Sequence, residues 1–266
     1  MVAADSSTSI TSLVFVAQMA PILDSKADKF LRKDDALFNK AWYTIDLSKR
    51  ISINNRIIYK SRLKAIKEKD EAFAYRVAIF ARSTYNDRNS EPARKTYASN
   101  LLNYYKQTND TANYLLHVVN YYDNFYMTIS IDSLRLRDSM LMKEAMSNAN
   151  AVIVKYGDTT RTKKTFSYAP IGQGYSSQLI EGAQNLFSMT TNPALTQKAL
   201  QWAIKANSFY ESSESLAVWA KILYSTGNRE EAINRQKQSI AIRQKQGFPT
   251  KAAEELLAKM TSGAKI

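Results

Sequence analysis

The chain has 266 residues and a formal net charge of +13, and it contains 7 glycines, 5 prolines and no cysteine. The scarcity of glycine and proline disfavours a β-sandwich or an α/β fold with many short loops, and the absence of cysteine excludes disulfides, zinc–thiolate sites and thiol catalysis. The excess of basic residues is spread along the chain and not gathered in one arm, so it favours nucleic-acid contact only slightly.

The first helical pattern lies in an apolar segment, Leu13–Leu23. The segment is shorter than the roughly 18–20 apolar residues that a membrane-spanning helix needs, Pro21 interrupts it, and no basic stretch precedes it. We therefore interpret it as the first core helix, from Thr11 to about Gln18, and not as a membrane span or a signal peptide.

Helical patterns continue through the N-terminal half of the chain. A second helix is expected at Ala27–Leu31, and a third at Leu37–Lys49 after a capping pair of aspartates. A long helix is expected from about Asn54 to Lys69, with an inward stripe formed by Ile58, Tyr59, Leu63 and Ile66. Another helix is expected at Glu71–Tyr85.

The middle of the chain predicts a helix–turn–helix at residues 91–126. Pro92 fits the first turn of the first helix, because the missing N–H of proline does no harm there, and Asp110 can cap the second helix. The only histidine, His117, lies on that second helix among apolar residues, which favours a packing role over a ligand or acid–base role. A further helix is expected at Leu134–Val154.

Residues 155–177 differ from the sequence on either side, because they are rich in glycine and proline and lack a helical period. They predict an irregular connection between an N-terminal helical block at 1–154 and a second block at 178–266. Gly172 and Gly174 form a G-x-G pair, but no strand precedes it and the third glycine is missing. We interpret the pair as a turn and not as a nucleotide-binding loop.

The second block predicts five helices, at Gln178–Met189, Pro193–Asn207, Ser213–Ser225, Arg229–Gln246 and Pro249–Met260. The third of these helices has an apolar face at the spacing i, i+3, i+4, i+7, formed by Leu216, Trp219, Ala220 and Leu223. Gly227 can end this helix in the left-handed conformation. Asn228 and Glu231 then form a capping box for the next helix, and Ala232 is small where the two helices would cross.

The register of these residues resembles that of the tetratricopeptide repeat, a helix pair of roughly 34 residues. Ala199 and Trp202 occupy the helix that corresponds to the second helix of the preceding repeat. The repeats are degenerate, because the aromatic, alanine and proline of the pattern are replaced by Gln236, Ser239 and Gln244. The resemblance implies an all-α array of antiparallel helix pairs, an α-solenoid, whose concave groove binds a protein or peptide.

The run Thr191–Ile240 is also similar to the C-terminal helical region of thioredoxin-like proteins exported by Bacteroidetes, and Leu101–Tyr122 resembles the middle of that region. In that family the redox chemistry belongs to an upstream thioredoxin domain with a Cys-x-x-Cys motif, and this sequence has no cysteine. The resemblance therefore implies a non-catalytic interaction or scaffold module, periplasmic or otherwise exported. It implies no cofactor and no metal.

Four basic residues follow the spacing i, i+4, i+8, i+11 on one helix face, namely Arg56, Lys60, Lys64 and Lys67. A solvated outer face explains them simply. The alternative is a site for an anionic partner, because like charges at this spacing repel one another unless something neutralises them. The aromatic residues of the middle helices, Tyr104 to Tyr126, could form stacking platforms, but their spacing favours interhelical packing.

Overall fold

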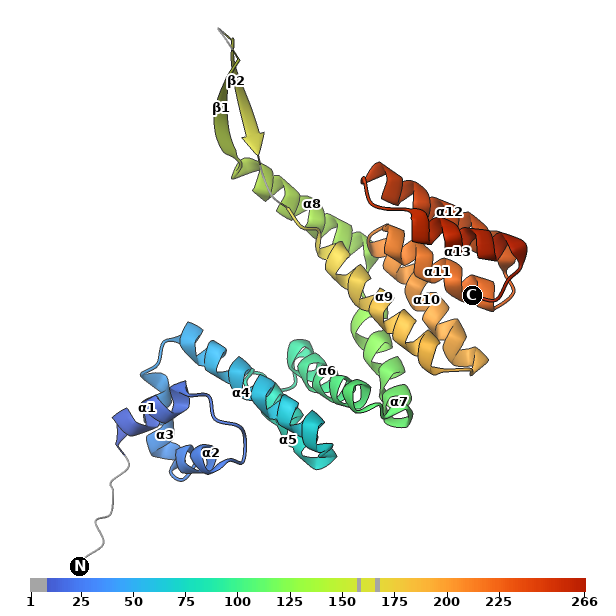
Figure 1. Cartoon of the computed structure of the whole chain (residues 1–266). Helices are drawn as coiled ribbons and strands as arrows, with labels where there is room; N and C mark the ends of the chain where they lie inside the picture. Colours follow the sequence, from blue (N-terminus) through green and yellow to red (C-terminus); the bar gives the residue numbers. More distant parts are fainter. Residues whose placement is uncertain (1–8, 157–158, 166–167) are drawn as a thin grey trace, which may run out of the picture. The chain divides into compact units, whose positions relative to one another are not determined.

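The computed structural model of the chain describes residues 9–156, 159–165 and 168–266 (Figure 1). Helices make up most of the residues that the structure describes, which confirms the expected all-α fold class. The one strand pair in the described part is a short hairpin, β1 (Asn150–Tyr156) and β2 (Thr159–Thr165).

The chain divides into two compact units, Met1–His117 and Val118–Ile266. The boundary lies within α7 (Thr111–Tyr122), so it differs from the division that the sequence suggested at residues 155–177. The reason is that α8 (Ile131–Ser147), the hairpin and α9 (Ile171–Met189) follow one another within the second unit, and α8 contacts α9.

The described residues of the first unit form six complete helices and the start of α7. In chain order these are α1 (Ile10–Gln18), α2 (Lys26–Leu31), α3 (Asp35–Tyr43), α4 (Leu47–Glu68), α5 (Glu71–Ser83) and α6 (Glu91–Thr108). Several begin at a polar residue whose side chain accepts a backbone N–H of the first turn, as expected of an N-cap. These residues are Ser9 for α1, Ser25 for α2, Asp34 for α3 and Asp70 for α5.

The sequence predicts one helix over Leu37–Lys49, but the structure has two, because α3 ends at Tyr43 and α4 begins at Leu47. The backbone N–H and the hydroxyl of Thr44 both donate to the carbonyl of Ala41, at 3.2 and 2.7 Å. These bonds to the residue three positions back tighten the last turn and compete with the α-helical pattern. The helix therefore ends there.

The predicted inward stripe of α4 is wrong at two of its four positions, since Ile58 and Ile66 are half-buried but Tyr59 and Leu63 face outward. Tyr59 and Leu63 are 54% and 47% exposed, whereas the buried side chains of α4 are Ile53, Ile57, Ser61 and Ala65. This buried face packs against α5 and α6. Two of its positions hold small residues, and at one of them the Ser61 hydroxyl accepts the backbone N–H of Leu23, so the row with the largest apolar side chains is not the buried one.

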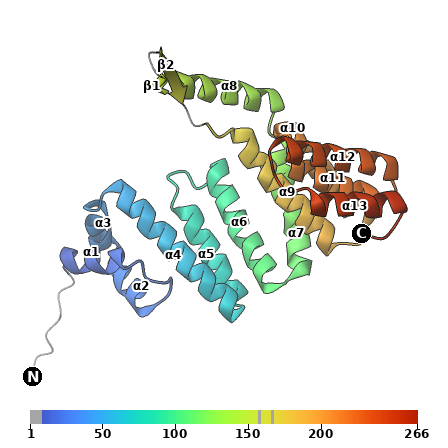
Figure 2. The same ribbon diagram turned by 45° about the horizontal axis from the view of Figure 1, so that its top comes forward.

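The second unit begins with the end of α7 and a π-helical turn, η1 (Asp123–Met127). The helices that follow are α8 (Ile131–Ser147), α9 (Ile171–Met189), α10 (Pro193–Phe209), α11 (Ser213–Ser225), α12 (Arg229–Lys245) and α13 (Lys251–Ser262). From α9 to α13 each helix packs against the next one, and α9 also contacts α11 (Figure 2). This block has the short connections and neighbouring helices that the sequence predicts.

The predicted irregular connection at 155–177 is in fact structured at both ends. Residues 150–156 pair antiparallel with 159–165, and α9 begins at Ile171 instead of near residue 178. Gly172 therefore lies in a helix and not in a turn. A Cβ atom at this position would lie 2.6 Å from the carbonyl oxygen of Phe209, so the glycine permits close contact with the end of α10.

The residues that carry the repeat resemblance lie in the packed interior of the second unit. Five of them are completely buried, namely Leu216, Ala220, Ala232, Ala199 and Trp202. Trp219 and Leu223 are 9% and 4% exposed. Gly227 follows the end of α11 with a φ of +88°, the left-handed conformation that favours glycine.

The predicted capping box at the start of α12 is not formed. Asn228 makes no side-chain bond to the first turn, because its amide group donates to the hydroxyl of Thr226 at 3.3 Å. A capping box occurs instead at the start of α11, where the side chains of Ser212 and Ser215 each accept a backbone N–H of the other residue.

Candidate functional site

The structure separates the four basic residues of α4 into two groups. Arg56 and Lys67 are exposed. Lys60 is half-buried, and its ammonium group donates to the carbonyl oxygens of Met19 and Ala20 at 2.9 and 3.1 Å. These carbonyls lie just after α1, where a cation is favoured by the helix dipole. Lys60 therefore anchors α1 to α4 and is not available to a ligand as part of a continuous basic face.

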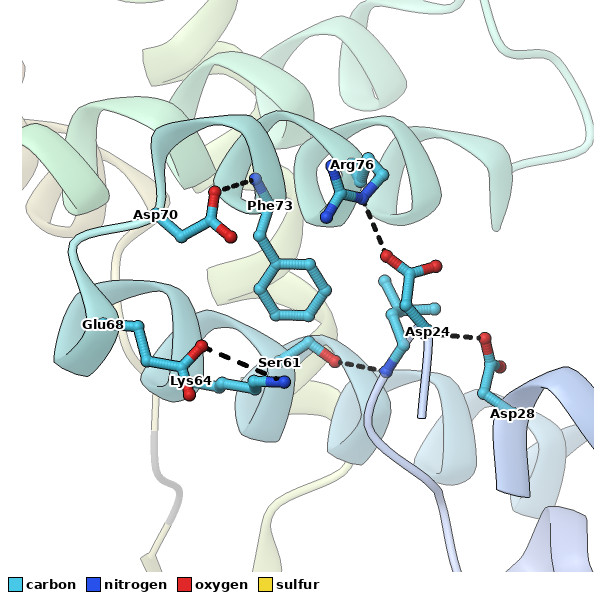
Figure 3. A network of polar contacts seen from close by, with 9 residues as sticks. Asp24, Asp28, Ser61, Lys64, Glu68, Asp70, Phe73 and Arg76 are labelled. Carbon is cyan, nitrogen blue, oxygen red and sulfur yellow. Dashed lines mark hydrogen bonds and ion pairs between the residues drawn. The ribbon is translucent and has the colours of Figure 1, made fainter. Parts of the chain in front are cut away.

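Lys64 is also engaged within the protein (Figure 3). Its ammonium group lies 3.9 Å from a carboxylate oxygen of Glu68 and 5.3 Å from the centre of the Phe73 ring. The guanidinium group of Arg76 lies at 5.3 Å from the centre of the same ring. Phe73 is buried, so the two cations cover the aromatic residue that packs α5 against α4.

A polar network holds the segment after α1 on the surface of α4 (Figure 3). The buried hydroxyl of Ser61 accepts the backbone N–H of Leu23 at 3.0 Å. Asp24 accepts from Arg76 at 2.7 Å, and its own N–H donates to Asp28 at 3.0 Å. The network fixes the orientation of α4 from one side and leaves its opposite side to solvent.

His117 has a packing environment, in agreement with the interpretation of the sequence. Its ring is half-buried and stacks on Tyr105, with ring centroids 5.6 Å apart and planes at 6°. The hydroxyl of Tyr105 lies 3.0 Å from a carboxylate oxygen of Glu71 and 3.1 Å from the hydroxyl of Tyr75. Burial, followed by these hydrogen bonds, raises the pKa of Tyr105 well above its ordinary value.

The aromatic residues around η1 form part of the core of the second unit. Tyr121, Tyr122 and Tyr126 are all less than a tenth exposed. Trp202 lies against Tyr122, with centroids 4.8 Å apart, and its indole N–H donates to Asp123 at 3.0 Å. Burial raises the pKa of Tyr121 and Tyr126. A stacking platform would need exposed ring faces, so these three tyrosines serve packing.

A pocket of about 370 Å³ opens between α9 and α11. Phe187 and Val218 supply apolar walls, while Gln184, Asn185 and Lys221 supply polar groups at its lining. This pocket could not be predicted from the sequence, because its walls come from two helices and from Ile266. Only the pairing of α9 with α11 brings these residues together.

Across the part of the chain that the structure describes, there is no group of three or more His, Cys, Asp or Glu side chains that could hold a metal ion. Within the same residues, no helix has the length and apolar character to span a membrane. Comparisons with models of known protein families, with curated proteins and with solved structures give no match.

Proposed function

We propose that this chain is a non-catalytic protein-interaction or scaffold module whose second unit is a degenerate tetratricopeptide-like α-solenoid. The observation that carries the proposal is the pocket between α9 and α11, at the side of a block of successively packed helices. In an array of helix pairs, α9 and α11 are the first helices of two consecutive pairs. First helices of neighbouring pairs line the concave surface that such arrays use for binding.

The chemistry of the pocket suits one side chain of a peptide. Its walls are mostly apolar, so they favour an aliphatic or aromatic side chain. The carboxamides of Gln184 and Asn185 can donate to and accept from a peptide backbone, and Lys221 favours an acidic group next to the apolar side chain. A protein or peptide partner is therefore the proposed ligand.

The resemblance of Thr191–Ile240 extends this proposal. It suggests that the module accompanies a thioredoxin-like domain in an exported protein and contributes no redox chemistry of its own. Polyanion binding by the basic face of α4 is the weaker alternative, because Lys60 and Lys64 contact other parts of the protein.

A substitution that fills the pocket tests the proposal. Val218→Trp places an indole in the space between α9 and α11, and Ile204→Trp adds the same group to a side chain that is 42% exposed on α10. Peptides selected from a random displayed library against the whole chain would be titrated with each variant. Loss of at least tenfold in affinity with Val218→Trp alone supports the proposal. Equal affinity for both variants would contradict it, provided that both keep the circular dichroism spectrum of the parent.

A further inference from the structure

The solvent-facing side of α4 carries a row of large apolar residues. Leu47, Ile51, Tyr59 and Leu63 are 63%, 53%, 54% and 47% exposed, and they are spaced by four or eight residues. We call these four residues the α4 ridge. Asn55 is the polar residue at the remaining position of the row. Exposed apolar rows of this length are characteristic of interaction surfaces.

The α4 ridge lies opposite the packed face of the same helix along its whole length. The buried residues of α4 also form a four-residue row, and that row is offset by two positions from the ridge. Two residues correspond to about 200° around an α-helix. The polar network that fixes α4 through Ser61 and Lys60 therefore presents the ridge outward in a defined orientation.

The ridge is bordered by positive charge. The sequence of α4 holds seven basic residues and one acidic residue, Glu68. On one side of the ridge Arg62 lies with its guanidinium 5.9 Å from the centre of the Tyr59 ring, and on the other side Arg56 is exposed. A partner must therefore offer an apolar centre with acidic borders, because like charge at the edges of an interface opposes association.

The geometry of the row selects the kind of partner. Residues spaced by four turn gradually around a helix, so the row from Leu47 to Leu63 winds through about 160°. A flat membrane surface can touch only one side of such a row. Another helix can follow it, because rows of this spacing are the ridges that pack into grooves between the side chains of a second helix.

We infer that the α4 ridge is a docking surface for an acidic amphipathic helix of a partner protein. The apolar stripe of the partner helix packs on Leu47, Ile51, Tyr59 and Leu63, and its acidic borders face Arg56 and Arg62. Nucleic acid fits less well, since a phosphate backbone offers nothing to the aliphatic side chains. This surface is distinct from the pocket between α9 and α11, so either proposal can fail while the other holds.

Two displayed peptide libraries test the inference. Both libraries encode 21-residue helices with leucine at every fourth position. One library has glutamate at the positions that border the leucine row, and the other has lysine at those positions. All remaining positions are randomised. Selection against the whole chain should enrich binders from the glutamate library only. Enrichment from the lysine library alone, or from neither, would overturn the inference. Binding to vesicles of equal phosphatidylcholine and phosphatidylglycerol, with no selected peptide, would instead assign the ridge to membranes.

Variants then locate the binding site. Ile51→Ser should lower the affinity for an enriched peptide at least tenfold. Ile79→Ser is the matched control, because Ile79 is similarly exposed, at 57%, but lies on α5 outside the ridge. It should leave the affinity unchanged. Arg56→Glu should weaken binding and reduce its salt dependence, whereas Arg94→Glu on α6 serves as the charge control. Equal losses in each variant and its control would overturn the inference. Val218→Trp should keep full affinity, which separates this surface from the pocket.

Discussion

Gly182 of α9 lies directly against the ring of Tyr122 at the end of α7. A Cβ atom on Gly182 would lie 2.6 Å from Cε2 and 2.7 Å from Cε1 of that ring, closer than real Cβ contacts allow. Tyr122 is itself held between Trp202 and Tyr126, with centroids 4.8 and 5.3 Å away. The ring therefore has no room to move away from α9, and glycine is required where the two helices meet.

Gly182→Ala should accordingly destabilise the protein. Forcing a methyl group into a packed core typically costs about 1–3 kcal/mol. Gly174→Ala is the matched control, because Gly174 lies in the same helix and a Cβ atom there meets nothing within 4 Å. In that open position alanine should stabilise the helix by about 0.4–1 kcal/mol. Urea unfolding of the two variants measures the difference, and similar midpoints would contradict the packing described.

Two other glycines show which structural features can be predicted from the sequence and which cannot. Gly227 could be predicted, because the reason for it is local: a helix ends there in the left-handed conformation. Gly172 was misinterpreted as part of a turn, because the reason for it is the carbonyl of Phe209, a residue distant in sequence. The same limit applies to the pocket, which exists only once α9 lies beside α11.

The faces of α4 illustrate a second limit. Hydrophobic periodicity indicated an inward row that included Tyr59 and Leu63, yet the helix buries Ser61 and Ala65. Small residues carry little hydrophobic signal although they mark close packing. In a helix that also exposes large apolar residues, periodicity therefore identifies the apolar rows but not which of them faces the core. Periodicity likewise placed Lys60 on the solvated face opposite the apolar row, although its ammonium group donates to the carbonyl oxygens of Met19 and Ala20.

The carboxylate of Asp138 on α8 caps α9 from outside the helix. Its two oxygens accept the backbone N–H groups of Ile171 and Gly172 at 2.7 and 3.1 Å. Asp138→Ala should lower the free energy of unfolding by about 1–2 kcal/mol, as the loss of a good helix cap does. Hydrogen exchange should speed up selectively at the first turn of α9. Glu144→Ala, at an exposed position of α8, is the control and should change neither quantity; equal effects would exclude the capping role.

Lys60 should contribute to stability whereas Lys67 should not. Lys60→Met keeps most of the aliphatic side chain but removes the hydrogen bonds to Met19 and Ala20, at a cost of about 1 kcal/mol. Lys67→Met changes an exposed side chain and should stay within about 0.5 kcal/mol of the parent. Thermal melts at matched protein concentration compare the two variants. If they melt together, the contacts of Lys60 contribute nothing to folding.

Alkaline pH should unfold the protein through its buried tyrosines. Burial raises the pKa of Tyr105, Tyr121 and Tyr126 above the ordinary value for tyrosine, which is about 10. In the unfolded chain these phenols lose their protons at about pH 10, while the folded protein keeps them protonated. The unfolded state then binds fewer protons, so stability is fully present below about pH 10 and falls as pH rises through the folded-state pKa values.

The measurement is the free energy of unfolding by urea between neutral pH and about pH 11, together with the ultraviolet absorbance of tyrosinate. The absorbance of the buried groups should appear together with the loss of helical circular dichroism and not before it. Tyr126→Phe removes one titrating group from the core and should flatten the alkaline fall in stability. Tyr43→Phe, at a residue that is 71% exposed, is the control for the loss of a phenol hydroxyl outside the core. A protein that ionises all its tyrosines while still folded would show that the aromatic core around η1 is open to water.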